Sequence, residues 1–136
     1  MAAAGPLHDA EKEYAEARLT AALVTDDPLP SHVELGLRAG AWLNGLCEAA
    51  SELRRYLLDR LRAGEMGQAD TLLAAMSDVY DTLVTIDYPD AVTGGLRRST
   101  DALRAVLERT RGDLTTTVLQ SRLQAAIETR LPPAPE

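Results

Sequence analysis

Two glutamates stand three residues apart in the segment EKEYAEARL, residues 11–19. On a helix that turns about 100° per residue, Glu13 and Glu16 project from neighbouring positions. Carboxylate oxygens are the ligands that a hard cation such as Mg²⁺ prefers, so this pair can supply half of a metal site. A bound Mg²⁺ would activate water against a phosphodiester. The alternative is that both glutamates are solvated and that Lys12 and Glu16 form an i,i+4 ion pair.

A second helical segment carries two more carboxylates on an unusual face. Glu48 and Glu52 lie one turn apart, opposite the leucines of that segment, and their neighbours include Ala41, Gly45 and Ala49. Small residues allow another backbone to approach, so we expect this face to be covered. Covered carboxylates need a partner.

Asp81 occupies a comparable position on a third segment. It projects away from the seam that contains Leu72 and Leu83, beside small or apolar residues. Three helices thus each offer carboxylates that a metal could share. Most helical carboxylates are nevertheless solvated, and the spacing alone favours the solvated alternative.

Four segments have apolar residues at three-to-four spacing, which predicts long helices over residues 7–24, 39–62, 66–86 and 96–130. Prolines break the pattern within residues 25–32. No segment shows the strict alternation of a strand. The predicted fold class is therefore all-α, an antiparallel helical bundle.

Individual residues predict how these helices pack and end. The expected seam of the first helix consists of Leu7, Ala10, Tyr14, Ala17, Ala21 and Val24. Ser31 is expected to cap a short helical turn, and Gly64 to end the second helix. Gly112 is a weak point, so the last segment is predicted to form either one long helix or two.

The composition indicates a single soluble domain. The chain has 136 residues, a formal net charge of -7 and one cysteine, Cys47. A lone cysteine excludes an internal disulfide, and no stretch has the length of a membrane span, so we predict a cytoplasmic protein. We expect one domain over residues 1–131 and a flexible tail at residues 132–136. The negative charge argues against nucleic-acid binding over the whole surface, but it leaves a local basic patch open.

Four motifs stand in a fixed order: KEYAEA at residues 12–17, WLNGLCEAASELRR at 42–55, SDVYDTL at 77–83 and GGLRRSTDALR at 94–104. The first resembles a QEYVEA-type segment, and the second a YL-G-hydrophobic run that ends in SEL or GEL and a basic residue. The third is similar to a VYDGF-type segment and the fourth to a GLRRKYD-type helix start. Together they resemble the translin family, in particular its translin-associated factor X branch, over nearly the whole chain.

The resemblance implies a translin-type helical bundle that assembles into a hollow homo-oligomer. It also implies a Mg²⁺-dependent endoribonuclease that acts on single-stranded RNA. Glu13, Glu16 and Asp81 match the family's catalytic, metal-binding acidic residues, and Glu52 matches a further acidic position. Family members carry more helices before the first motif, where this sequence has only MAAAGPLHDA.

Two other functions remain open. One is a non-catalytic oligomer subunit that binds single-stranded RNA or DNA, and the other is an acidic helical scaffold that binds protein. Binding of RNA requires positive charge. The predicted nucleic-acid-binding residues are Arg97, Arg98, Arg104, Arg109 and Arg111. A second basic cluster consists of Arg54, Arg55, Arg60 and Arg62. Any one of these arginines could instead be solvated or ion-paired.

Overall fold

The computed structural model describes residues 5–86, 95–132, 134 and 135. Within these residues the chain forms α1 (Pro6–Thr25), α2 (His32–Leu35), α3 (Ala39–Arg62), α4 (Met66–Leu83) and α6 (Leu96–Arg130), and no strand. The predicted all-α class is confirmed. None of these helices is long and apolar enough to cross a membrane. The predicted break over residues 87–95 lies outside the described residues except for Gly95.

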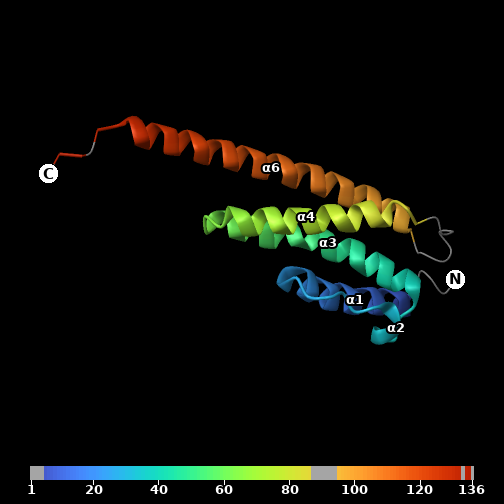
Figure 1. Cartoon of the computed structure of the whole chain (residues 1–136). Helices are drawn as coiled ribbons and strands as arrows, with labels where there is room; N and C mark the ends of the chain where they lie inside the picture. Colours follow the sequence, from blue (N-terminus) through green and yellow to red (C-terminus); the bar gives the residue numbers. More distant parts are fainter. Residues whose placement is uncertain (1–4, 87–94, 133, 136) are drawn as a thin grey trace.

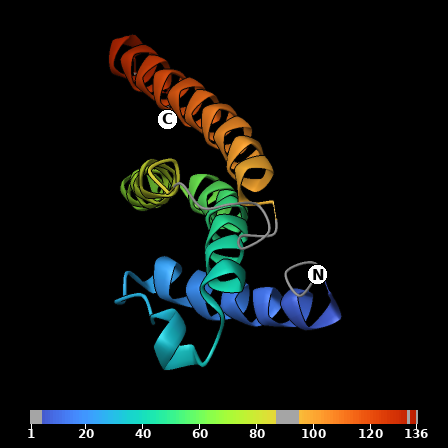
Figure 2. The same cartoon turned by 90° about the vertical axis from the view of Figure 1, so that its right-hand side faces the viewer.

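α3 is the central element of the fold (Figure 1). α1 packs against one side of α3, while α4 and α6 pack against it elsewhere and against each other. The directions of α3, α4 and α6 alternate along the bundle, and α1 crosses α3 (Figures 1 and 2). α1 makes hardly any contact with α4. Side chains of α1 are therefore positioned by α3.

The apolar stripes predicted for α3, α4 and α6 form the core. The large side chains that are fully buried include Leu19, Leu53, Leu57, Met76, Leu83 and Leu103. Each such side chain stabilises the fold by roughly 1.5–3 kcal/mol relative to an exposed one. Cys47 is also buried, and burial, followed by the charge of Glu48, raises the pKa of its thiol to about 12. The thiol is therefore a neutral core group at physiological pH.

The seam predicted for α1 is wrong. All six of its residues are exposed, with Leu7 at 59%. The helix instead buries His8, Ala15, Leu19, Thr20 and Ala22.

Gly45 of α3 explains which face of α1 is buried. A Cβ atom placed on Gly45 would lie 2.5 Å from Ala15 Cβ and 2.9 Å from the Lys12 carbonyl oxygen. The two helices thus meet almost backbone to backbone, which only a small residue on each side permits. The close approach to Gly45, rather than the bulkiest apolar stripe, selects the face. The small-residue face of α3 is covered, as the sequence predicted.

The ends of the helices follow the sequence with one exception. Ser31 caps α2, because its Oγ accepts a hydrogen bond of 3.1 Å from the Glu34 amide. α4 ends at Leu83, three residues earlier than predicted. The β-branched run Val84, Thr85 and Ile86 has low helix propensity, and the last turn is closed by i,i+3 bonds instead.

α6 is one unbroken helix through Gly112. Arg54 of α3 fastens this region, since its guanidinium donates to Thr110 Oγ1 at 3.1 Å and to an Asp113 carboxylate oxygen at 2.6 Å. Leu107 and Leu114 are buried on the same stretch. Tertiary contacts on both sides of the glycine offset its weak helix propensity. The last turns of α6 extend beyond the rest of the bundle (Figure 1).

Candidate metal and RNA site

A pocket between α1 and α3 gathers three of the four carboxylates predicted to bind metal. Its volume is about 440 Å³. The lining residues are Glu13, Glu16, Ala17, Thr20 and Ala21 of α1 and Glu52, Arg55 and Tyr56 of α3. α1 crosses α3 at Gly45. Beside this crossing, partly exposed side chains of α1 face partly exposed side chains of α3. We call this site the acidic pocket.

Glu48 belongs to the same charge cluster. Burial raises the pKa of Glu16, and the negative charges of Glu48, then Glu52, and more weakly Glu13 raise it further, whereas Lys12 lowers it. The charges of Glu13, Glu48 and Glu52, from two helices, therefore all act on Glu16 at this crossing. Such a concentration of negative charge favours a cation. Glu48 is expected from its sequence position to lie on the covered face of α3, but it is not among the predicted metal ligands.

Gly45 brings these carboxylates together. The backbone amide nitrogen of Glu16 would lie 3.1 Å from a Cβ at Gly45. Glu48 follows Gly45 by three residues, within one turn of the same helix. The tight helix crossing thus sets how close the α1 and α3 carboxylates come.

Thr20 adds a second polar feature to the acidic pocket. Its side chain is 8% exposed, and its Oγ1 has no hydrogen-bond partner among the described residues. Buried hydroxyls are almost always hydrogen-bonded. Thr20 lines the pocket, but its Oγ1 is itself enclosed by protein atoms.

The structure does not bring Asp81 into the acidic pocket. Asp81 is exposed on α4, and α4 hardly touches α1. Its charge is not among those that shift the pKa of Glu16. The predicted grouping of Glu13, Glu16 and Asp81 is therefore not assembled within one chain.

The gathered carboxylates do not converge on one point. Within the described part of the chain, no group of three or more His, Cys, Asp or Glu side chains is arranged so that it could hold a metal ion. One reason is that Glu52 is turned toward Arg55, whose Nε lies 2.7 Å from Glu52 Oε1. Glutamate side chains have three rotatable bonds and can occupy other rotamers.

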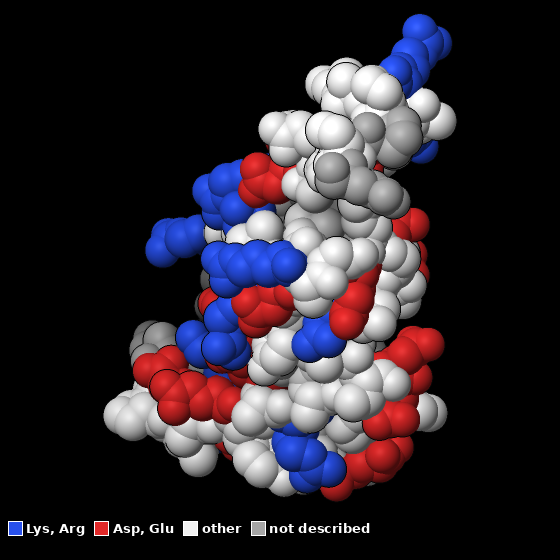
Figure 3. Space-filling model, turned by 90° about the vertical axis from the view of Figure 1, so that its left-hand side faces the viewer, with Lys and Arg blue, Asp and Glu red and all other residues white. Residues whose placement is uncertain are grey.

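The predicted RNA-binding arginines lie elsewhere. Arg97, Arg98, Arg104, Arg109 and Arg111 are all exposed on α6. Arg104 forms an ion pair with Glu108 at 3.2 Å. Figure 3 shows basic and acidic side chains interleaved over one face of the molecule, with several basic side chains toward its left side and acidic ones at the lower right. Arg55 is the arginine that lines the acidic pocket, and the sequence placed it only in the second basic cluster.

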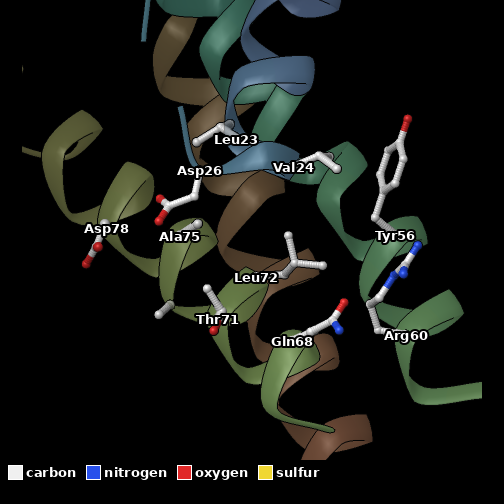
Figure 4. Close-up of a pocket in the computed structure, with 11 residues that line it drawn as sticks. Leu23, Val24, Asp26, Tyr56, Arg60, Gln68, Thr71, Leu72, Ala75 and Asp78 are labelled. Atoms are coloured by element: carbon white, nitrogen blue, oxygen red, sulfur yellow. The ribbon is translucent and has the colours of Figure 1, made fainter. Parts of the chain in front are cut away.

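A second cavity of about 440 Å³ lies between the end of α1, α3 and α4 (Figure 4). Leu72 lies on its floor, with Tyr56 and Arg60 on the α3 side and Asp26 and Asp78 on the other. The remaining lining is mainly apolar. Among the described residues, only two carboxylates, Asp26 and Asp78, line this cavity, whereas three line the acidic pocket, so the acidic pocket is the stronger candidate for a metal site.

Comparisons with known proteins agree with this architecture. No protein-family model matches the sequence. The uncharacterized protein MJ0175 of Methanocaldococcus jannaschii is 30% identical over 121 residues, which make up 88% of this chain and 54% of that protein. The structure of an AfC3PO–duplex RNA complex superposes with a TM-score of 0.77 and the crystal structure of AfC3PO with 0.76, both at 31% identity. Each match covers 83% of this chain, and 59% and 60% of the respective AfC3PO chains. The chain thus spans a little over half the length of these relatives.

Proposed function

Because this chain belongs to the translin family, we propose that it is a Mg²⁺-dependent endoribonuclease that acts on single-stranded RNA. The observation that carries the proposal is the gathering of Glu13, Glu16, Glu48 and Glu52 from two helices at one crossing. The AfC3PO complex with duplex RNA supports RNA as the class of ligand.

The donors in the acidic pocket suit a hard divalent cation. Glu13, Glu16 and Glu52 line the pocket and Glu48 belongs to the same charge cluster; their carboxylate oxygens are ligands that Mg²⁺ prefers. The mutual repulsion that raises the pKa of Glu16 would be relieved by a cation. In this proposal Glu13, Glu16, Glu48 and Glu52 hold the metal, directly or through water.

A bound Mg²⁺ would supply an activated water and offset the negative charge of the scissile phosphate. In this proposal the carboxylates would orient that water, and one of the glutamates would accept a proton from it. Tyr56 lines the pocket on the α3 side.

Asp81 is not among the metal ligands of this proposal. Within one chain it lies on α4, apart from the acidic pocket. It takes part in the reaction only if a second copy of the chain brings it to the site. Replacing Asp81 therefore distinguishes two hypotheses. In one, the metal ligands are those that the sequence motifs suggest, with Asp81 among them; in the other, they are the carboxylates that the fold gathers around the acidic pocket.

The decisive experiment is cleavage of a labelled single-stranded RNA with and without Mg²⁺. We expect Mg²⁺-dependent cleavage by the native chain and its loss in Glu16→Gln and Glu48→Gln. Asp81→Asn should retain activity if the acidic pocket of one chain is sufficient. Binding of the RNA without cleavage at any Mg²⁺ concentration would favour the alternative, a non-catalytic single-stranded RNA- or DNA-binding subunit.

We also propose that the chain forms a homo-oligomer. Leu119, Leu123 and Ile127 recur every four residues near the C-terminal end of α6, and Leu131 follows as its C-cap; each of the four is between 49% and 61% exposed. A contiguous apolar row of this kind marks a protein–protein contact. Sedimentation should show a larger species for the native chain than for the double variant Leu123→Glu/Ile127→Glu. Equal sizes would exclude this row as the contact.

A further inference from the structure

Arg55 differs from the other arginines of α3 because it lines the acidic pocket. The same pocket is lined by Glu13, Glu16 and Glu52, the carboxylates proposed to bind the cation. Its Nε lies 2.7 Å from Glu52 Oε1. Its guanidinium carbon lies 5.0 Å from the centre of the Tyr56 ring, and one of its terminal nitrogens lies 3.4 Å from the Tyr56 hydroxyl. The side chain is 66% exposed, so solvent and ligands can reach it.

We propose that Arg55 binds the phosphate group of the RNA strand at the acidic pocket, and that its ion pair with Glu52 holds it in reserve until the carboxylates bind a cation. The inference rests on the proposed function, because it needs a cation in that pocket. It assigns Arg55 a role that the predicted RNA-binding residues of α6 do not fill.

The geometry favours Arg55 over the other arginines of α3. Arg54 is occupied between α3 and α6, where it bonds Thr110 and Asp113. Arg62 pairs with Asp59 and does not line the acidic pocket. Arg55 is therefore the guanidinium that can meet a phosphate next to the carboxylates.

The ion pair explains why the cation must come first. Without a cation, Glu13, Glu16 and Glu48 repel a phosphate, and Glu52 occupies the guanidinium. When Glu52 exchanges Arg55 for a cation, the guanidinium loses its partner beside a pocket that is no longer so negative. A guanidinium binds phosphate through two parallel hydrogen bonds, which a carboxylate pair would otherwise use. The Tyr56 ring keeps the guanidinium plane near the pocket throughout.

The test measures RNA binding and cation binding separately. Fluorescence anisotropy of a labelled single-stranded RNA is recorded in EDTA and in Ca²⁺, a cation that uses the same oxygen ligands. Binding of Mn²⁺ to the protein alone is followed by electron paramagnetic resonance. The variants are Arg55→Ala, Arg55→Lys and, as a matched control, Arg62→Ala, which also breaks an i,i+3 ion pair on α3.

We expect Ca²⁺ to tighten RNA binding by about tenfold or more in the native chain, the gain of one charge-assisted phosphate contact. Arg55→Ala should lose most of this gain, Arg55→Lys should keep part of it, and Arg62→Ala should keep all of it. Arg55→Ala should bind Mn²⁺ at least as tightly as the native chain, because Glu52 is released. If Arg55 had only a structural role, its replacement would not weaken RNA binding while leaving Mn²⁺ binding equal or tighter.

A second comparison uses Glu52→Gln, which frees Arg55 without a cation. In EDTA this variant should bind RNA more tightly than the native chain, and the gain should vanish in Glu52→Gln/Arg55→Ala. If the native chain binds no Mn²⁺, the proposed function fails and this inference with it. If Mn²⁺ binds and Ca²⁺ tightens RNA binding equally in the native chain and in Arg55→Ala, only the role of Arg55 is overturned.

Discussion

Gly45 of α3 and Ala15 of α1 mark the closest approach of the two helices that carry the acidic pocket. A Cβ on Gly45 would lie 2.5 Å from Ala15 Cβ, a distance that real Cβ atoms do not adopt. The backbone of α1 is also within reach there, so no flexible side chain can move aside. The separation of the carboxylates on α1 from those on α3 therefore depends on the absence of one methyl group.

Replacing Gly45 by Ala should push α1 away from α3. We expect a loss of stability of roughly 1–3 kcal/mol, typical of overpacking, and weaker Mn²⁺ binding, because Glu13 and Glu16 move away from Glu48. Denaturant unfolding and electron paramagnetic resonance measure the two effects. The matched control is Gly112→Ala on α6, where a Cβ meets nothing within 4 Å. That change should stabilise the chain by about 0.5–1 kcal/mol. Similar responses of the two variants would refute the tight crossing.

The carboxylates that bind the cation should be those of the acidic pocket. Glu16→Gln and Glu48→Gln should each weaken Mn²⁺ binding by tenfold or more, on the order of one lost charged ligand. Asp81→Asn should leave Mn²⁺ binding of the monomer unchanged, because Asp81 is exposed on α4. If Asp81→Asn abolishes Mn²⁺ binding while Glu48→Gln does not, the assignment of Glu48 rather than Asp81 as a metal ligand is incorrect.

The stability of the metal-free chain should respond to pH through Glu16. Its pKa is raised in the folded state by burial and by Glu48, so the folded chain holds the proton more tightly than the unfolded chain. Stability therefore falls as the pH rises from the ordinary glutamate value through the raised one. Glu16→Gln removes this loss. It should be more stable than the native chain at pH 7 by about 1 kcal/mol or less, since the site is partly solvated, and should show no advantage below the ordinary value.

Thermal unfolding at several pH values in EDTA checks this effect. Addition of Mn²⁺ at pH 7 should stabilise the native chain more than Glu16→Gln, because ligand binding to the folded state raises its stability. An advantage of Glu16→Gln that is the same at every pH would show that the charge of Glu16 is not responsible.

Arg54 should matter for stability rather than for the site. Its bonds to Thr110 and Asp113 join α3 to α6, and its side chain is only 22% exposed. Arg54→Ala should lower the free energy of unfolding by roughly 1–3 kcal/mol, because it removes hydrogen bonds to a charged group. Arg104→Ala, which breaks the exposed pair with Glu108, should change it by about 0.5 kcal/mol or less. Urea unfolding of both variants measures the difference, and equal losses would contradict a role for Arg54 in joining the helices.

Local pattern was enough to predict much of this fold. The 3.6-residue period of apolar residues predicted the four long helices, and Ser31 predicted the start of α2. Both predictions succeeded because helix formation and capping depend on residues close in sequence. The leucine stripes of α3, α4 and α6 became the core for the same reason. The small residues around Gly45 correctly indicated that a helix would cover that face. The sequence also singled out Glu13, Glu16 and Glu52 as candidate metal ligands, and the structure places all three around the acidic pocket.

Only the tertiary structure decided which groups meet. Which face of α1 is buried depends on backbone contact with Gly45. The spacing of apolar residues in α1 carries no information about that contact. Asp81 and Glu48 both project from small-residue faces in the sequence, yet α1 crosses α3 and not α4, so only Glu48 reaches Glu16. The pairing of Arg55 with Glu52 beside that pocket likewise follows from packing. Distances between side chains on different helices are set by how the helices cross, and this information is not local in the chain.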